Sequence, residues 1–140
     1  MASAFNKFNF FVEDLGKKIH NLNADVLKIM LTNSAPVATN HVLADLTEIT
    51  AHNGYSAGGV TPTNSGCVQT AGVDKLVLQD VTLTASGGTI GPFRYAVLYN
   101  STPAAGNLIG WYDYGSSITL QDGESFVIDL DQTDGVLTIT

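Results

Sequence analysis

The chain contains a single cysteine, Cys67, among its 140 residues. One cysteine excludes an intrachain disulfide framework and a zinc site built from several cysteines. No apolar run approaches the roughly 20 residues that cross a bilayer. The N-terminus also lacks the basic segment and apolar stretch of a secretory signal. We therefore predict no membrane partner and synthesis in a cytoplasm. Cys67 is predicted to be a small, partly buried residue in a strand.

Positive charge is scarce. The chain has six Lys and Arg residues and 13 Asp and Glu residues. After residue 75, Arg94 is the single basic residue, whereas seven residues are acidic. This balance excludes a nucleic-acid-binding face, which needs clustered basic residues. Charged residues make up 14% of the chain, against about 25% in typical globular domains. Such a low share favours a surface that is partly buried in an assembly.

The chain also lacks a cluster of residues typical of catalysis or metal binding. Its three histidines, His20, His41 and His52, do not have the short spacing of a metal site. Asp129 and Asp131 fall on one face of a predicted strand, which we interpret as its solvated face. No glycine-rich loop matches a phosphate-binding loop or a nucleophile elbow. We predict that the protein is not an enzyme and holds no cofactor and no metal ion.

Strand-like runs dominate the sequence after Val26, and turn residues separate them. No linker or repeat divides residues 1–140, so they are predicted to form a single all-β domain. About eight strands with frequent turns are typical of a β-sandwich or barrel. Besides a brief strand around Val60, the predicted strands are Val26–Thr32, Leu76–Thr84, Phe93–Asn100, Leu108–Tyr114, Ser117–Gln121, Ser125–Asp131 and Val136–Thr140.

Turn signals leave the strand connections open. Asp122-Gly123 and Asp134-Gly135 are two-residue turn signals. In a meander both close hairpins, whereas in a jelly roll at least one is a corner between sheets. Helix is expected only as short turns within Val12–His20 and Val42–Ile49, and residues 51–66 are expected to form a long loop.

Two of the predicted strands, Phe93–Asn100 and Leu108–Tyr114, are apolar on both faces. A strand with one wet face alternates apolar and polar residues more cleanly. We expect a second sheet to cover one face. The other face is covered either by a partner, which predicts a homodimer, or within the subunit by the N-terminal arm or the 51–66 loop.

Residues 1–12 form a phenylalanine-rich arm whose rings need a cover, because each buries roughly 150–250 Å². We expect part of the arm to dock on a neighbouring subunit while the rest seals the sandwich. Together with aromatic residues of the two doubly apolar strands, it supplies the predicted interface: Phe5, Phe8, Phe10, Phe11, Tyr95, Tyr99, Trp111 and Tyr112.

Several segments resemble the head decoration, or cement, proteins of tailed bacteriophages. These segments are FVEDLGKKIHNL, LKIMLTNSAPV, ADLTEITAHNGYSAGG and, most specifically, IGPFRYAVLYN (Ile90–Asn100) and LIGWYDYGSSITL (Leu108–Leu120). The resemblance implies a jelly-roll β-sandwich that binds the outer surface of an icosahedral capsid. It also implies a dimeric structural protein of the virion that stabilises the capsid by bridging neighbouring major capsid proteins.

Two other functions remain open at the level of sequence. Small β-sandwiches also occur as structural or receptor-binding components of phage tails and baseplates. Alternatively, Trp111, Tyr112 and Tyr114 supply a sugar-stacking platform, which is typical of a carbohydrate-binding module.

Overall fold

The computed structural model describes residues 4–140 and is all-β, as the sequence predicts. In chain order its elements are β1 (Phe5–Lys7), α1 (Phe10–Gly16), β2 (Leu27–Thr32), the 3-10 turn η1 (Leu43–Asp45), β3 (Asn64–Thr70), β4 (Val73–Leu78), β5 (Val81–Thr84), β6 (Ile90–Asn100), β7 (Leu108–Leu120), β8 (Ser125–Ile128) and β9 (Leu137–Ile139).

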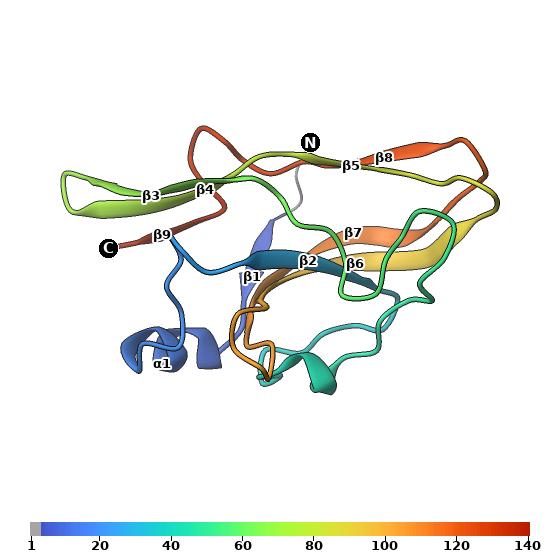
Figure 1. Ribbon diagram of the computed structural model, residues 1–140. Coiled ribbons are helices and arrows are strands. Elements are labelled where there is room, and N and C mark those ends of the chain that lie inside the picture. The colour runs from blue at the N-terminus through green and yellow to red at the C-terminus, as the bar shows by residue number, and fades with distance from the viewer. Residues whose placement is uncertain (1–3) are drawn as a thin grey trace.

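The strands form two layers (Figure 1). The central sheet is antiparallel with the order β1-β7-β6-β2. The outer layer contains β3-β4-β9 and β5-β8, and β4 runs almost directly into β5. The main core lies between the layers and includes Ile29, Leu31, Leu76, Leu78, Phe93, Leu98, Ile109 and Ile128. These contacts make the fold a β-sandwich.

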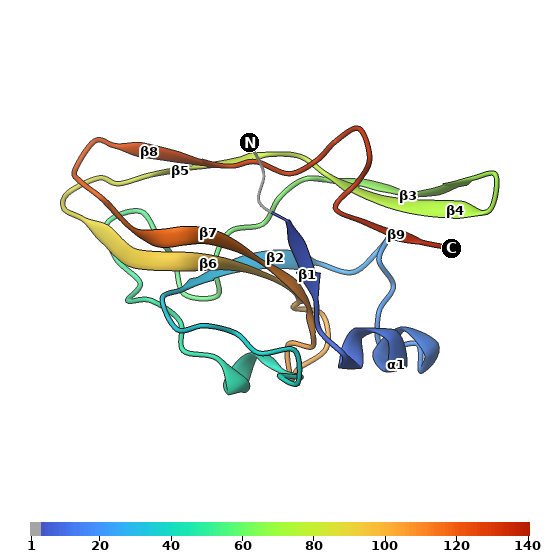
Figure 2. The same cartoon turned by 180° about the vertical axis from the view of Figure 1, so that it is seen from behind.

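The central strands β6 and β7 are covered on both faces, as their composition predicts. Ala96 and Leu98 face the main core, while Val97 and Tyr99 face a second core on the opposite side of the sheet. In Figures 1 and 2 that opposite side carries α1 and the loop that contains η1. The second cover therefore comes from the same chain, and the argument for a dimer from these two strands no longer holds.

Several strand predictions were wrong. β3 was not predicted and begins within the expected 51–66 loop, and the strand predicted for Ser125–Asp131 ends at Ile128. Two boundaries within longer runs also differ. Leu76–Thr84 is divided between β4 and β5, and the carboxylate of Asp80, which lies in the break, accepts the Leu130 N–H at 2.7 Å. Conversely, Leu108–Tyr114 and Ser117–Gln121 belong to one strand, β7. Gly115, with φ +87°, lies between them, and irregular pairing with β6 accommodates it without ending the strand.

Neither Asp-Gly pair closes a hairpin. Asp122-Gly123 connects β7 of the central sheet to β8 of the outer layer, so it is a corner between sheets. Asp134-Gly135 connects β8 to β9, which pair with different strands. The tight hairpin turn is Ala71-Gly72 between β3 and β4, where both residues have positive φ, +52° and +81°. This arrangement is typical of a type I′ turn, and its Ala-Gly sequence gave no clear signal.

Helical structure begins earlier and is shorter than expected. α1 starts at Phe10, inside the predicted arm, rather than at Val12. In the Val42–Ile49 region helix is limited to η1, where the Asp45 carboxylate accepts the N–H groups of His41 and Val42 at 2.9 and 3.1 Å. This capping holds one turn while Leu43 and Leu46 pack against the second core.

Candidate functional site

The aromatic residues predicted to form an interface lie largely inside the subunit. Phe8, Phe11, Tyr95, Tyr99 and Tyr112 are buried. Phe5, Phe10 and Trp111 are half-buried. Residues 1–3 of the predicted arm lie outside the described residues. The arm from Phe5 onward is therefore a part of the sandwich, because β1 pairs with β7 and the following residues pack beneath the central sheet.

Phe8 is the centre of the second core. It is fully buried, and its ring centroid lies 4.6 Å from that of Trp111. Its N–H donates to the carbonyl of Ile109 at 3.1 Å. Met30 and Tyr99 belong to the same buried group. Of the two covers that the sequence left open for this side of β6 and β7, the structure has the one within the subunit, by the N-terminal arm, and not a partner.

A buried carboxylate fixes α1 to the rest of the molecule. Asp14 is 4% exposed, and its Oδ2 lies 2.8 Å from His41 Nε2. The same oxygen accepts a hydrogen bond from Asn107 Nδ2 at 2.9 Å. The Phe10 ring stacks on His41, with centroids 4.1 Å apart. Two partners on one oxygen anchor the helix to the loop before η1 and to the segment that enters β7.

A second polar group lies beside the first. Asn100 Nδ2 contacts His20 Nδ1 at 3.2 Å and donates to Asp25 Oδ2 at 2.6 Å. Because His20 Nδ1 then accepts, the proton of the neutral ring is on Nε2, which is buried without a hydrogen-bond partner. Burial also lowers the pKa of His20, so the ring is neutral at pH 7. The Phe11 ring lies 5.3 Å away and contributes to this burial.

Sequence reasoning treated these histidines as ordinary polar residues and missed both groups. Their members are separated by up to 93 residues, as between Asp14 and Asn107. No local motif connects them, since the contacts arise only when α1 docks beneath the central sheet.

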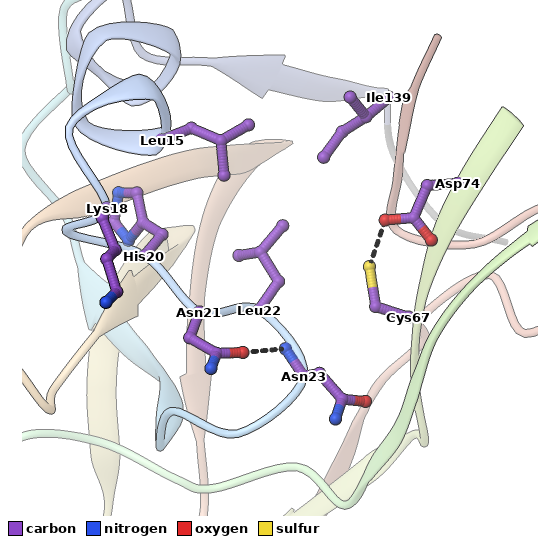
Figure 3. A pocket seen from close by; sticks show the side chains of 9 residues that line it. All are labelled: Leu15, Lys18, His20, Asn21, Leu22, Asn23, Cys67, Asp74 and Ile139. Carbon is purple, nitrogen blue, oxygen red and sulfur yellow. Dashed lines mark hydrogen bonds between the residues drawn. The ribbon is translucent and has the colours of Figure 1, made fainter. Parts of the chain in front are cut away.

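An open cleft lies at the α1 end of the sandwich, between α1 with the segment that follows it and the outer layer (Figure 3). Its volume is about 380 Å³. Leu15 and Leu22 approach it from one side, and Ile139 and Cys67 from the other. The remaining lining is polar: Lys18, His20, Asn21, Asn23 and Asp74.

Cys67 is not a reactive thiol in this cleft. Its Sγ donates to Asp74 Oδ2 at 2.6 Å. Burial, reinforced by the Asp74 carboxylate, raises the pKa of the thiol to about 12. The thiolate is the nucleophile and the metal ligand, so at neutral pH Cys67 remains protonated and suits a structural position, as predicted for it.

Two further hollows adjoin the cleft at the α1 end. One, of about 430 Å³, is lined by Lys18, Ile19, Asn21, Asp25, Thr102 and Pro103. The other, of about 240 Å³, is lined by Lys7, Phe11, Val12, Leu15, Thr138, Ile139 and Thr140. Val12 and Ile19 are 53% and 37% exposed. This end combines grooves, exposed apolar side chains and lysines, and it is the best candidate for a docking surface.

The aromatic residues of β7 do not form one flat platform. Trp111 packs on Phe8 in the second core, whereas Tyr112 lies on the other face, with its ring centroid 5.2 Å from that of Phe5. Tyr114 meets Phe126 edge to face at 5.1 Å. A sugar-stacking platform requires neighbouring exposed rings, and this arrangement does not favour one.

Within residues 4–140, no group of three or more His, Cys, Asp or Glu side chains is placed to hold a metal ion. In the same part of the chain, no helix has the length and apolarity to cross a membrane. Comparison of the chain with protein-family models, with characterised proteins and with solved structures finds no match in any of the three.

Proposed function

We propose that this protein is a structural component of a tailed-phage virion that decorates the outer capsid surface and bridges neighbouring major capsid proteins. The observation that carries the proposal is the resemblance of Ile90–Asn100 and Leu108–Leu120 to decoration proteins. These segments are β6 and β7, the two central strands of the sandwich. The resemblance therefore concerns the scaffold of the fold.

The α1 end is the proposed capsid-binding surface. Its hollows and its exposed Val12 and Ile19 offer apolar surface to a partner. Lys7 and Lys18 line the hollows, while Asp14 is already engaged with His41 and Asn107. A protein that binds the assembled shell but not dispersed subunits stabilises the shell by mass action. Many copies acting together make a modest interface sufficient.

The test is addition of purified protein to capsids assembled without it, followed by pelleting. The proposal predicts saturable binding and capsids that withstand higher temperature. Failure to bind the capsid, or labelling of tails instead of heads by antibodies in electron microscopy, would refute it in favour of a tail component.

A double variant tests the surface itself. Val12→Asp combined with Lys18→Glu places negative charge on the α1 end and is expected to weaken capsid binding at least tenfold. Val127→Asp is the matched control, because Val127 is 49% exposed on β8, away from the α1 end (Figure 1). If the control weakens binding and the double variant does not, capsids bind the outer layer instead.

A further inference from the structure

We propose that two copies of this protein associate by pairing their β3 strands edge to edge, antiparallel and centred on Val68. The sequence led us to expect a homodimer, and this inference gives it an interface that does not involve β6 or β7. It is tested in solution without capsids, so it fails or succeeds independently of the capsid-binding function.

The first observation is that the chain protects one long sheet edge and leaves another open. Along the outer edge of β2, Ile29 and Val60 exchange two backbone hydrogen bonds of 2.8 and 2.9 Å, and Ile49 N–H donates to Leu31 at 3.1 Å. The other edge strands, β1, β5, β8 and β9, have only three or four residues. Among the described strands, the seven-residue β3 is the long one whose outer edge pairs with no other strand.

The second observation identifies which groups of β3 face outward. The carbonyl of Leu76 accepts the Val136 N–H at 2.8 Å, so it points away from β3, and the residue opposite Leu76 is Cys67. Hydrogen-bonded and non-hydrogen-bonded pairs alternate along an antiparallel ladder. The backbone N–H and C=O groups of Cys67 and Gln69 therefore point to the open edge, while Val68 bonds inward to β4.

This spacing suits a two-fold axis at Val68. With Val68 opposite Val68 of the second copy, Cys67 faces Gln69 of the other chain in both directions. Each such pair exchanges two hydrogen bonds, so all the outward groups of Cys67 and Gln69 are satisfied. The two Val68 side chains then meet in a non-hydrogen-bonded pair, with Cα atoms about 4.5 Å apart. In the free subunit Val68 is 69% exposed, the most exposed of the large apolar side chains described.

Composition and shape favour a second copy as the occupant. Open edges are usually protected by charge, proline or a β-bulge. The β3 sequence NSGCVQT contains no charged residue and no proline, and its irregularity lies between Asn64 and Gly66, outside the residues proposed to pair. Because the edge is uncharged, it does not select a foreign strand by charge. The outward N–H and C=O groups of Cys67 and Gln69 lie symmetrically about Val68, so they are complementary to the same groups of a second copy. The β3–β4 hairpin also projects from the end of the sandwich in both views, which gives a second copy access (Figures 1 and 2).

Sedimentation equilibrium over micromolar to millimolar concentrations tests the pairing. We expect the wild type to show a monomer–dimer equilibrium. Val68→Lys places like charges directly opposite each other, which destabilises a strand pair, and is expected to weaken dimerisation at least tenfold. Val127→Lys, at the exposed position of β8, is expected to leave it unchanged. A wild-type monomer at all concentrations, or equal behaviour of the two variants, overturns the proposal.

A cross-linking experiment tests the register. In a Cys67→Ser background, Val68→Cys places the two thiols at a spacing that a disulfide spans. We expect mild oxidation to produce a covalent dimer, and Val127→Cys in the same background to remain monomeric. If the wild type dimerises but Val68→Cys does not cross-link, the copies associate through another surface and the proposed interface is wrong.

Discussion

The two layers of the sandwich are covered differently. The central sheet has an apolar core on each face, and its strands β6 and β7 are 11 and 13 residues long. The outer layer packs on one face only, and its other face carries the exposed Val68 and Val127. The comparison shows that apolarity on both faces of a strand predicts two covers without identifying their source. Here the segment around Phe8 and the loop that contains η1, both of the same chain, supply the second.

The largest expected effect is at the second core. Phe8→Ala removes a fully buried ring and is expected to lower the free energy of unfolding by about 3–5 kcal/mol. Urea unfolding followed by fluorescence reports this site directly, because the single tryptophan, Trp111, contacts Phe8. Val12→Ala, at an exposed helix position, is the control and should change stability by less than about 0.5 kcal/mol. A stable Phe8→Ala variant would mean that the second cover unfolds separately from the sandwich.

Substitutions at two neighbouring residues of β2 allow the two faces of the central sheet to be compared. Leu31 faces the main core and Met30 the second core. Substitution of each by Ala is expected to cost about 2–5 kcal/mol. Leu31→Ala should cost more, because two sheets collapse less readily around a cavity than loops do. Only Met30→Ala should shift the native emission of Trp111. The reverse order of stabilities would show that the loops hold the second core as rigidly as a sheet.

His20 provides a pH-dependent test of how the segment after α1 packs against Phe11 and Asn100. Its pKa is lowered in the folded protein, so the unfolded chain binds the proton first as pH falls. Stability is therefore complete above the unfolded pKa of about 6.5 and decreases below it, by at most about 1.4 kcal/mol per pH unit. Unfolding free energies at pH 7 and pH 5 measure this loss. His20→Gln should reduce this loss of stability, whereas substitution of the exposed His52 by Gln should not. An equal loss in the wild type and both variants would show that other groups cause the pH dependence.

The smallest expected effect is at the hairpin of the outer layer. Ala71 adopts φ +52° in a type I′ turn, where Asn is preferred. Ala71→Asn is expected to stabilise the protein by about 0.5–1 kcal/mol. Gly72→Ala should destabilise it by about 1–2 kcal/mol through backbone strain alone, since no atom lies within 4 Å of the added Cβ. Thermal unfolding of both variants checks the signs; destabilisation by Asn would contradict the turn assignment.

The sequence predicted the elements whose causes are local. Runs that are apolar on both faces identified β6 and much of β7, and glycine- and aspartate-containing segments indicated where the chain turns. The boundaries that were wrong depend on long-range contacts. The break after β4 is fixed by Asp80 and Leu130, which are 50 residues apart. The unbroken β7 depends on pairing with β6 across its bulges.

By itself, the sequence determined that this protein is all-β with two doubly apolar strands, because strand propensity and the burial of apolar side chains act on each segment directly. Only the tertiary structure decided what covers those strands. The apolar ring of Phe8 suits a core residue as well as a docking arm. The Asp122-Gly123 turn is likewise compatible with a hairpin and with a corner between sheets. The choice depends on which surfaces fit together, as when Asp14 meets Asn107 and fixes α1 beneath the sheet.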